Sequence, residues 1–345
     1  MKTKHKGWRR SRSMVVGLTL TAMIAGACGG DDGDASDADT SSGGTEAPAE
    51  AGLTKVKATT LGLCNESNMY WGVEQGVFEK HGLEVELVRS AGGAAGVAAL
   101  MSGAVDFSFT NGFTSIISFT QGFPLRFASS AYEIAMPPLP KVSSLAVKAD
   151  SPLQSAKDVV GKRVGVNELG GVNQIAVNQW LRKGGVDPKD VNFVALPFSE
   201  LVSAVGAGRI DVAAVPLANI LSQPTVYRSL GDPFVEGVGN VVFAAYLVTE
   251  EFLEDNEETA KAFLAAMDES TTAAEDPANA QALAEASAKR CGGDASVLIK
   301  QLHNDYEAYV DYDLLKDMAG VLVEEGMLRE VPDIEQLVPE FARKK

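Results

Sequence analysis

Short apolar strands alternate with helical segments between Leu61 and Gly112, and this alternation constrains the fold more than any other feature of the sequence. An apolar run leads into a polar loop and a helical segment, and Leu83–Val88 then alternates apolar and acidic side chains as a half-buried strand does. The pair Gly92-Gly93 opens a second helix, and Val105–Phe109 is a third strand. This order predicts a parallel sheet with right-handed crossovers and helices on both faces.

A second alternation of the same kind follows, with strands at Lys162–Val166, Val191–Leu196 and Ile210–Val215. A chain of 345 residues can form two domains with ample cores. We therefore predict an α/β fold of two domains joined by a two-strand hinge, with the helices after residue 250 packing back on the first domain. The predicted bounds are 54–142 with 248–345 for the first domain, 143–247 for the second, and 142–149 and 241–248 for the hinge strands.

The first 27 residues have the features of a bacterial lipoprotein signal peptide. They hold six Lys or Arg side chains and no acid, and their apolar run, Met14–Ile24, is too short to span a bilayer comfortably. Small residues precede Cys28, which we predict to be the lipidated new amino terminus; the alternative is an ordinary secretory cleavage. Residues 28–53 are acidic and poor in apolar side chains, which predicts a disordered tether.

Charge and motifs exclude several classes of function. The net charge of −16 argues against nucleic-acid binding. Neither the metal-binding spacing H-E-x-x-H nor a Walker-type phosphate loop occurs in the sequence. We therefore expect no cofactor and no metal.

Several spaced motifs, in order along the chain, resemble one family of transport proteins. "GVFEKHGLEVELV" and "GGAAGVAALMSGAVDFSFTNG" are similar to the amino-terminal half of ABC-importer substrate-binding proteins that handle nitrate, alkanesulfonates, taurine and thiamine pyrimidine precursors. "SPLQSAKDVVGKRVGV" and the stretch Gly185–Ile220 resemble its second half, so the resemblance covers roughly Val56 to Val248. It implies a type II periplasmic-binding-protein fold that traps a small molecule between hinged domains. It also implies a monomer outside the cytoplasm that delivers its ligand to an ABC permease and its ATPase.

Candidate ligand-binding residues follow from the loops at the carboxyl ends of the strands, where open α/β sheets bind ligands. In the first domain they are Asn68, Tyr70, Trp71, Gly92, Gly93, Thr110, Asn111, Tyr132 and Glu133. In the second domain they are Glu168, Gly171, Val172, Asn173, Pro216 and Asn219. Some have simpler roles open to them: Asn111 and Asn173 could cap turns or helices.

These residues include amides, rings and two carboxylates but no Lys or Arg. That chemistry favours a flat, nitrogen-rich, neutral or cationic molecule, and a thiamine-type pyrimidine is the first choice. A sulfonate, taurine or nitrate is the second, held by backbone N–H groups at Gly92-Gly93 and Gly171–Asn173.

Two other functions remain open, a lipid-anchored sensor subunit and an enzyme such as a desulfinase or pyrimidine synthase on the same fold. An enzyme would need Cys64 as a nucleophile with a base, and the mature chain retains only His81 and His303. We expect binding rather than catalysis. Cys64 and Cys291 either pair outside the cytoplasm or stay as free thiols, with a buried Cys64.

Replacing Cys28 should abolish lipidation, because the thiol is the acceptor. Labelling cells with a radioactive fatty acid should mark the wild-type protein and leave Cys28→Ala unlabelled. Cys64→Ala, which keeps Cys28, should retain the label. Label on Cys28→Ala would contradict the prediction.

Overall fold

The computed structural model describes residues 52–134, 143–221, 223–299 and 305–345. The predicted signal peptide, Cys28 and the tether up to residue 51 lie outside these residues, as do His303 and Val142, the first residue of the predicted hinge strand 142–149.

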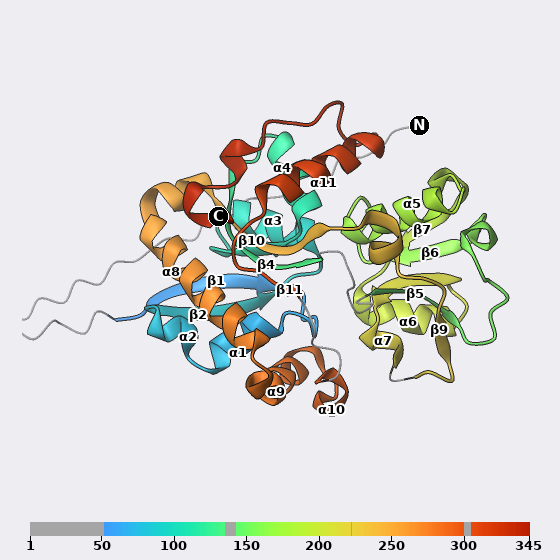
Figure 1. The fold of residues 1–345 in the computed structure, drawn as a ribbon, viewed down its shortest axis with the longest axis horizontal. Helices are drawn as coiled ribbons and strands as arrows, with labels where there is room; N and C mark the ends of the chain where they lie inside the picture. Colours follow the sequence, from blue (N-terminus) through green and yellow to red (C-terminus); the bar gives the residue numbers. More distant parts are fainter. Residues whose placement is uncertain (1–51, 135–142, 222, 300–304) are drawn as a thin grey trace, which may run out of the picture. The chain divides into compact units, whose positions relative to one another are not determined.

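The first half of the chain forms the predicted strand–helix alternation. Its elements are β1 (Thr54–Thr60), α1 (Ser67–Glu74), α2 (Val77–Lys80), β2 (Leu83–Arg89), α3 (Gly93–Met101), β3 (Ser108–Thr110), α4 (Gly112–Thr120) and β4 (Leu125–Ile134). β1 pairs in parallel with β2 over its whole length, as predicted, and a parallel bridge joins Ala58 to Phe107 ahead of β3. Because parallel strands begin and end at the same edges, the loops after β1 and β2 lie on one edge of this pair (Figure 1).

A four-stranded sheet, in the order β11-β4-β10-β3, stands beside this pair. It contains β10 (Val241–Thr249) and β11 (Asp305–Tyr306). The sequence predicted parallel sheets, whereas β10 is antiparallel to both β4 and β3. The reason is topological: β4 leads toward the second half of the chain and β10 returns from it, so strands placed side by side must run in opposite directions. This sheet is therefore antiparallel throughout, whereas β1 and β2 are parallel.

The middle of the chain forms a five-stranded sheet in the order β7-β6-β8-β5-β9. β6 is parallel to β7 and β8, and β5 is antiparallel to β8 and β9. The elements are β5 (Ser143–Lys148), η1 (Ala156–Val159), β6 (Arg163–Val166), α5 (Val172–Lys183), η2 (Pro188–Asp190), β7 (Asn192–Ala195), α6 (Phe198–Gly206), β8 (Val212–Pro216), α7 (Ala218–Leu221), β9 (Tyr227–Ser229) and the π-helical turn η3 (Phe234–Val238).

We group these elements into two lobes by the sheets that they cover. The largest hydrophobic core packs the sheets of β1–β4, β10 and β11, which with their helices form the first lobe, and it extends to Val172, Ile175 and Ala176 on α5 and to Phe234 on η3. Two smaller clusters pack the sheet of β5–β9 from its two faces, and these elements form the second lobe. The segment predicted as the returning hinge strand lies in β10 and pairs within the first lobe. The domain bounds themselves stay a prediction.

Helices after residue 250 pack on the first lobe, in agreement with the sequence. They are α8 (Glu250–Glu275), η4 (Pro277–Asn279), α9 (Ala280–Cys291), α10 (Ala295–Leu298) and α11 (Tyr312–Glu324), followed by the turns η5 (Glu335–Leu337) and η6 (Glu340–Ala342). The Thr249 side chain accepts a hydrogen bond from Phe252 N at 3.0 Å and so caps α8. On the buried face of α8, Phe263 stacks on Phe107 with ring centroids 4.0 Å apart. Among the described residues, no helix is both long and apolar enough to cross a bilayer.

A disulfide joins Cys64 to Cys291, which resolves the alternative that the sequence left open. Cys64 lies in the loop after β1, and Cys291 ends α9. The bridge therefore ties a helix near the carboxyl end of the chain to the loop that follows the first strand. It also leaves the Cys64 sulfur without the free thiol that a nucleophile requires.

Replacing both cysteines by serine should lower the free energy of unfolding by about 3–5 kcal/mol, because a cross-link across a long loop restricts the unfolded chain. This loop spans 227 residues. Urea denaturation measures the change, and wild-type protein in reductant should unfold like the double variant. Equal stabilities of oxidised wild type and double variant would contradict the prediction.

Candidate binding site

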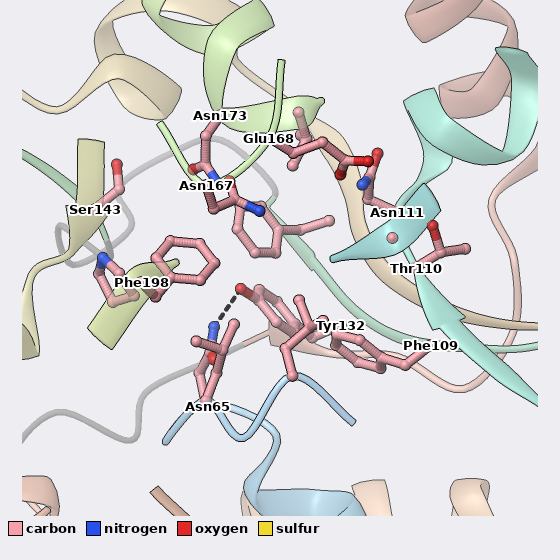
Figure 2. Close-up of a pocket in the computed structure, with 16 residues that line it drawn as sticks. Asn65, Phe109, Thr110, Asn111, Tyr132, Ser143, Asn167, Glu168, Asn173 and Phe198 are labelled. Atoms are coloured by element: carbon pink, nitrogen blue, oxygen red, sulfur yellow. Dashed lines mark hydrogen bonds between the residues drawn. The ribbon is translucent and has the colours of Figure 1, made fainter. Parts of the chain in front are cut away.

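A small pocket lies where the two lobes meet, and both lobes line it (Figure 2). The first lobe contributes Leu61, Leu63, Asn65, Gly93, Phe109, Thr110, Asn111, Tyr132 and Phe243. The second contributes Ser143, Asn167, Glu168, Val172, Asn173, Phe198 and Pro216. Its free volume is about 40 Å³, and a single water needs about 10–15 Å³ by the same measure. A ring-sized ligand therefore requires the walls to move apart.

A buried carboxylate holds the loop that carries Leu61 and Leu63. Glu66 Oε1 accepts hydrogen bonds from Leu61 N at 3.1 Å and from Leu63 N at 2.8 Å. Its other oxygen lies 2.5 Å from the Thr60 hydroxyl, which also contacts the Tyr70 hydroxyl at 2.7 Å. Because Glu66 is only 2% exposed, burial raises its pKa from 4.5 to about 7, although these hydrogen bonds oppose the shift. A protonated Glu66 would donate to Thr60 and still accept from both backbone groups.

The aromatic part of the lining is built on the paired strands β4 and β10. Tyr132 stacks on Phe243 with ring centroids 4.9 Å apart, and Phe243 meets Phe234 edge-on. The Tyr132 hydroxyl accepts a hydrogen bond from Asn65 Nδ2 at 2.5 Å (Figure 2). Burial raises the pKa of this phenol well above its usual value, so it stays neutral. The arrangement offers a flat apolar surface with a hydroxyl at its edge.

Glu168 reaches from the second lobe to the first. Its Oε1 accepts a hydrogen bond from Ala94 N at 3.2 Å, in the first turn of α3. Burial raises the pKa of Glu168, and the backbone N–H groups of Ala94 and Gly93 oppose the shift. In Figure 2 its carboxyl group extends toward Asn111. It is the one charged side chain among the described lining residues.

Two of the lining amides already have partners within the protein. Asn111 caps α4: its Oδ1 accepts from Thr114 N at 3.0 Å, and its Nδ2 donates to the Thr114 hydroxyl at 3.0 Å. Asn173 donates to Asn167 Oδ1 at 2.6 Å, which braces the loop that carries Glu168. The capping role that the sequence left open is therefore present for Asn111, whereas Asn173 lies inside α5, after its N-cap residue Gly171.

The pocket brings together eight of the fifteen predicted ligand-binding residues: Gly93, Thr110, Asn111, Tyr132, Glu168, Val172, Asn173 and Pro216. They share a position at a strand end or at the start of the following helix. Whether each contacts a ligand stays a prediction.

The other seven do not line the pocket, and three of these belong to α1. Asn68 is buried and donates to Ala131 O at 2.9 Å. Tyr70 is fully buried and turned toward Thr60, and Trp71 packs on the core of the first lobe. Because α1 begins only at Ser67, its side chains point into the lobe rather than past the strand ends.

The remaining four predicted residues also lie outside the pocket, one because side chains alternate along a strand and three because of their place in the chain. Glu133 follows Tyr132 on β4 and so points to the opposite face, where Lys344 lies 3.7 Å from its carboxylate. Gly92 and Gly171 are the residues that precede α3 and α5, and both adjoin the Glu168 side chain rather than the pocket. Asn219 lies within α7, beyond the end of β8.

Sequence reasoning missed eight lining residues: Leu61, Leu63, Asn65, Phe109, Ser143, Asn167, Phe198 and Phe243. Asn65 and Asn167 belong to the loops that were identified, so position alone could have included them. The apolar members carried no signal, because a phenylalanine that faces a pocket has the same strand pattern as one that faces a core. Arg89, the last residue of β2, is the basic residue closest in sequence to the candidate glycines Gly92 and Gly93. Its guanidinium lies against Gly62, and it does not line the pocket.

Comparison with known proteins places this geometry in a family. The profile of the family described as NMT1/THI5 like matches residues 64–280, more than half of the chain. The chain belongs to the NMT1/THI5-like family. A relative in Brucella abortus, provisionally described as a binding protein, is 26% identical over 226 residues. The match covers 58% of this chain and 62% of that protein, less than two thirds of the relative's length.

Solved structures show the fold of this NMT1/THI5-like protein. The alkanesulfonate-binding protein SsuA from Xanthomonas axonopodis pv. citri, bound to MOPS, superposes with a TM-score of 0.71 at 16% identity, covering 84% of this chain and 99% of that one. The periplasmic nitrate-binding protein NrtA from Synechocystis gives a TM-score of 0.70 at 16% identity, covering 84% and 86%. The fold is that of periplasmic binding proteins, as the sequence predicted.

The protein should lose stability as the pH rises from about 5 to about 8, because Glu66 folds most favourably when protonated. Its folded pKa of about 7 lies above the unfolded value of 4.5, so its contribution is present below pH 4.5 and is lost as the pH passes 7. Glu66→Gln mimics the protonated form and should flatten the pH dependence in thermal unfolding.

Glu133 is the matched comparison, because burial raises its pKa to about 7 as well, away from the pocket. Glu133→Gln should also reduce the pH dependence of stability over this range, and the double variant should show the smallest pH dependence. A Glu66→Gln variant with the full wild-type pH dependence would contradict the assignment. Glu66→Ala should cost about 1–3 kcal/mol, because it leaves the Leu61 and Leu63 amides without a partner.

Proposed function

We propose that this protein is the extracytoplasmic solute-binding component of an ABC importer. It binds a small molecule between its two lobes and delivers it to a permease and its ATPase in the cell membrane, acting as a carrier rather than an enzyme. The family match, the fold and the pocket between lobes support this function. The Cys64–Cys291 disulfide supports an oxidising location and argues against Cys64 as a catalytic nucleophile. Lipidation at Cys28 would anchor the chain beside its permease.

The ligand we propose is a flat, neutral or cationic nitrogen heterocycle, with a thiamine-type pyrimidine as the first choice. The observation that carries this proposal is the pocket lining. Among the described lining residues, Glu168 is the one charged side chain, and none is Lys or Arg. A ring can stack on Tyr132 or Phe198, and its N–H groups can donate to Glu168.

A sulfonate or nitrate is the second candidate, supported by the ligands named for SsuA and NrtA. Against it, an anion about 4 Å from the Glu168 carboxylate would meet a repulsion of about 1–4 kcal/mol. Moreover, the Ala94 N–H that could hold an anion already donates to Glu168.

Binding requires the lobes to separate and close again, because the pocket is smaller than a ring. Closure around the ligand then depends on the ligand contacting both lobes at once. Tyr132 from the first lobe and Phe198 from the second would make those contacts.

Calorimetric titration of ligand-free protein should show heat with hydroxymethylpyrimidine and none with taurine, methanesulfonate or nitrate. Phe198→Ala should weaken pyrimidine binding roughly tenfold, because stacking contributes about 0.5–1.5 kcal/mol beyond its buried area. Phe123→Ala, at an exposed phenylalanine outside the pocket, is the matched control and should bind as wild type does. Heat with the anions alone would favour the second candidate.

A further inference from the structure

We infer that Glu168 excludes anionic ligands from this site by filling, with its own carboxylate, the anion-binding start of α3. This inference rests on the proposed function as a solute-binding protein and adds a residue that sets its specificity. The structural relatives named for anions share the fold, so the preference that we propose for this chain would have to come from its side chains.

The start of α3 has the features of an anion site but no local residue that fills it. A helix of nine residues presents free N–H groups and a partial positive charge at its amino end. Its first turn holds no acidic residue, and the N-cap residue Gly92 makes no side-chain capping bond. The carboxylate that accepts from Ala94 N instead comes from Glu168, on the other lobe. Glu168 thus replaces a local cap.

The glycines at the start of α3 have no side chains, and this gives the Glu168 carboxylate space to lie against the helix start. A Cβ at Gly92 would lie 3.3 Å from Glu168 Oε2 and therefore crowd the carboxylate. A Cβ at Gly93 would lie 2.7 Å from Thr110 Oγ1, which is too close to be tolerated without movement. The Thr110 hydroxyl is consequently next to the same helix start.

Thr110 provides the independent sign that this place is built for a polar group. It is 2% exposed, and its hydroxyl has no hydrogen-bond partner among the described residues. A buried hydroxyl without a partner costs free energy, which an incoming acceptor would recover. Together with the Gly93 and Ala94 amides, the Thr110 hydroxyl would offer a third donor to an oxyanion bound at this helix start.

The loop around Glu168 is braced so that the carboxylate stays in place. Asn173 donates to Asn167 Oδ1 at 2.6 Å, and Gly170 N donates to Gln174 Oε1 at 2.6 Å. These bonds clamp both flanks of Glu168 to the first turns of α5. An external anion would have to displace a held carboxylate of the same charge sign. A cation or an N–H donor would instead bind to the remaining lone pairs of the Glu168 carboxylate, which can accept further hydrogen bonds.

The test removes the internal carboxylate and asks whether the site gains an anion. Glu168→Ala should bind methanesulfonate at least tenfold more tightly than wild type in calorimetric titration, and adding Thr110→Val should reverse most of that gain. Should Glu168→Ala fail to fold, Glu168→Gln keeps the size, removes the charge and should gain at least threefold. A folded Glu168→Ala protein without gain, or a wild type that binds methanesulfonate as tightly, would overturn the inference.

Glu325→Gln is the matched control, because it weakens a different contact between the lobes. Glu325 lies at the end of α11 and accepts from Asn178 Nδ2 and Gln179 Nε2 at 2.8 Å each, and from Arg182 Nε at 3.0 Å, all on α5. It does not line the pocket, so it should gain no methanesulfonate affinity. An equal gain would mean that loosened lobes, and not an emptied helix start, admit the anion.

The test of Glu168 and the test of the proposed pyrimidine ligand can fail independently of each other. A wild type that binds neither pyrimidine nor methanesulfonate, together with a Glu168→Ala variant that binds methanesulfonate, supports the inference and contradicts the pyrimidine proposal. A wild type that binds pyrimidine, with no gain in the variant, does the reverse.

Discussion

The antiparallel pairing of β4 with β10 is the contact on which both the fold and the pocket depend. These two strands of the first lobe, one before and one after the second lobe in the sequence, run in opposite directions, and their backbone hydrogen bonds fix them side by side. The pairing places Ala244 opposite Tyr132, so Phe243 comes into stacking contact with the Tyr132 ring. Without it, the stacked rings of Tyr132 and Phe243 in the pocket would have no common support.

Two carboxylates, the buried Glu66 and the partly buried Glu168, then organise the walls in different ways. Glu66 works within one lobe and satisfies the backbone of the loop that carries Leu61 and Leu63. Glu168 works between lobes and satisfies the backbone at the start of α3. In both cases the carboxylate accepts hydrogen bonds from backbone N–H groups of a loop or a helix start. The first carboxylate shapes the pocket, whereas the second also places a charge in it.

Much of the site could be predicted from the order of strands and loops. Gly93, Thr110, Tyr132 and Glu168 were reached because ligands bind past the carboxyl ends of parallel strands. The direction in which each side chain points was harder to predict from the sequence. Tyr132 faces the pocket and Glu133 does not, and one residue of strand register separates the two outcomes.

The sequence by itself determined the alternation of strands and helices, because this depends on local periodicity, whereas the lipoprotein signal and the domain bounds stay predictions. Only the tertiary structure decided which strand neighbours which, because pairing of β4 with β10 joins residues more than a hundred positions apart. The same holds for the Cys64–Cys291 bridge and for the contact of Glu168 with Ala94. Such contacts arise from the packing of whole elements, and no local pattern encodes the distance between their side chains.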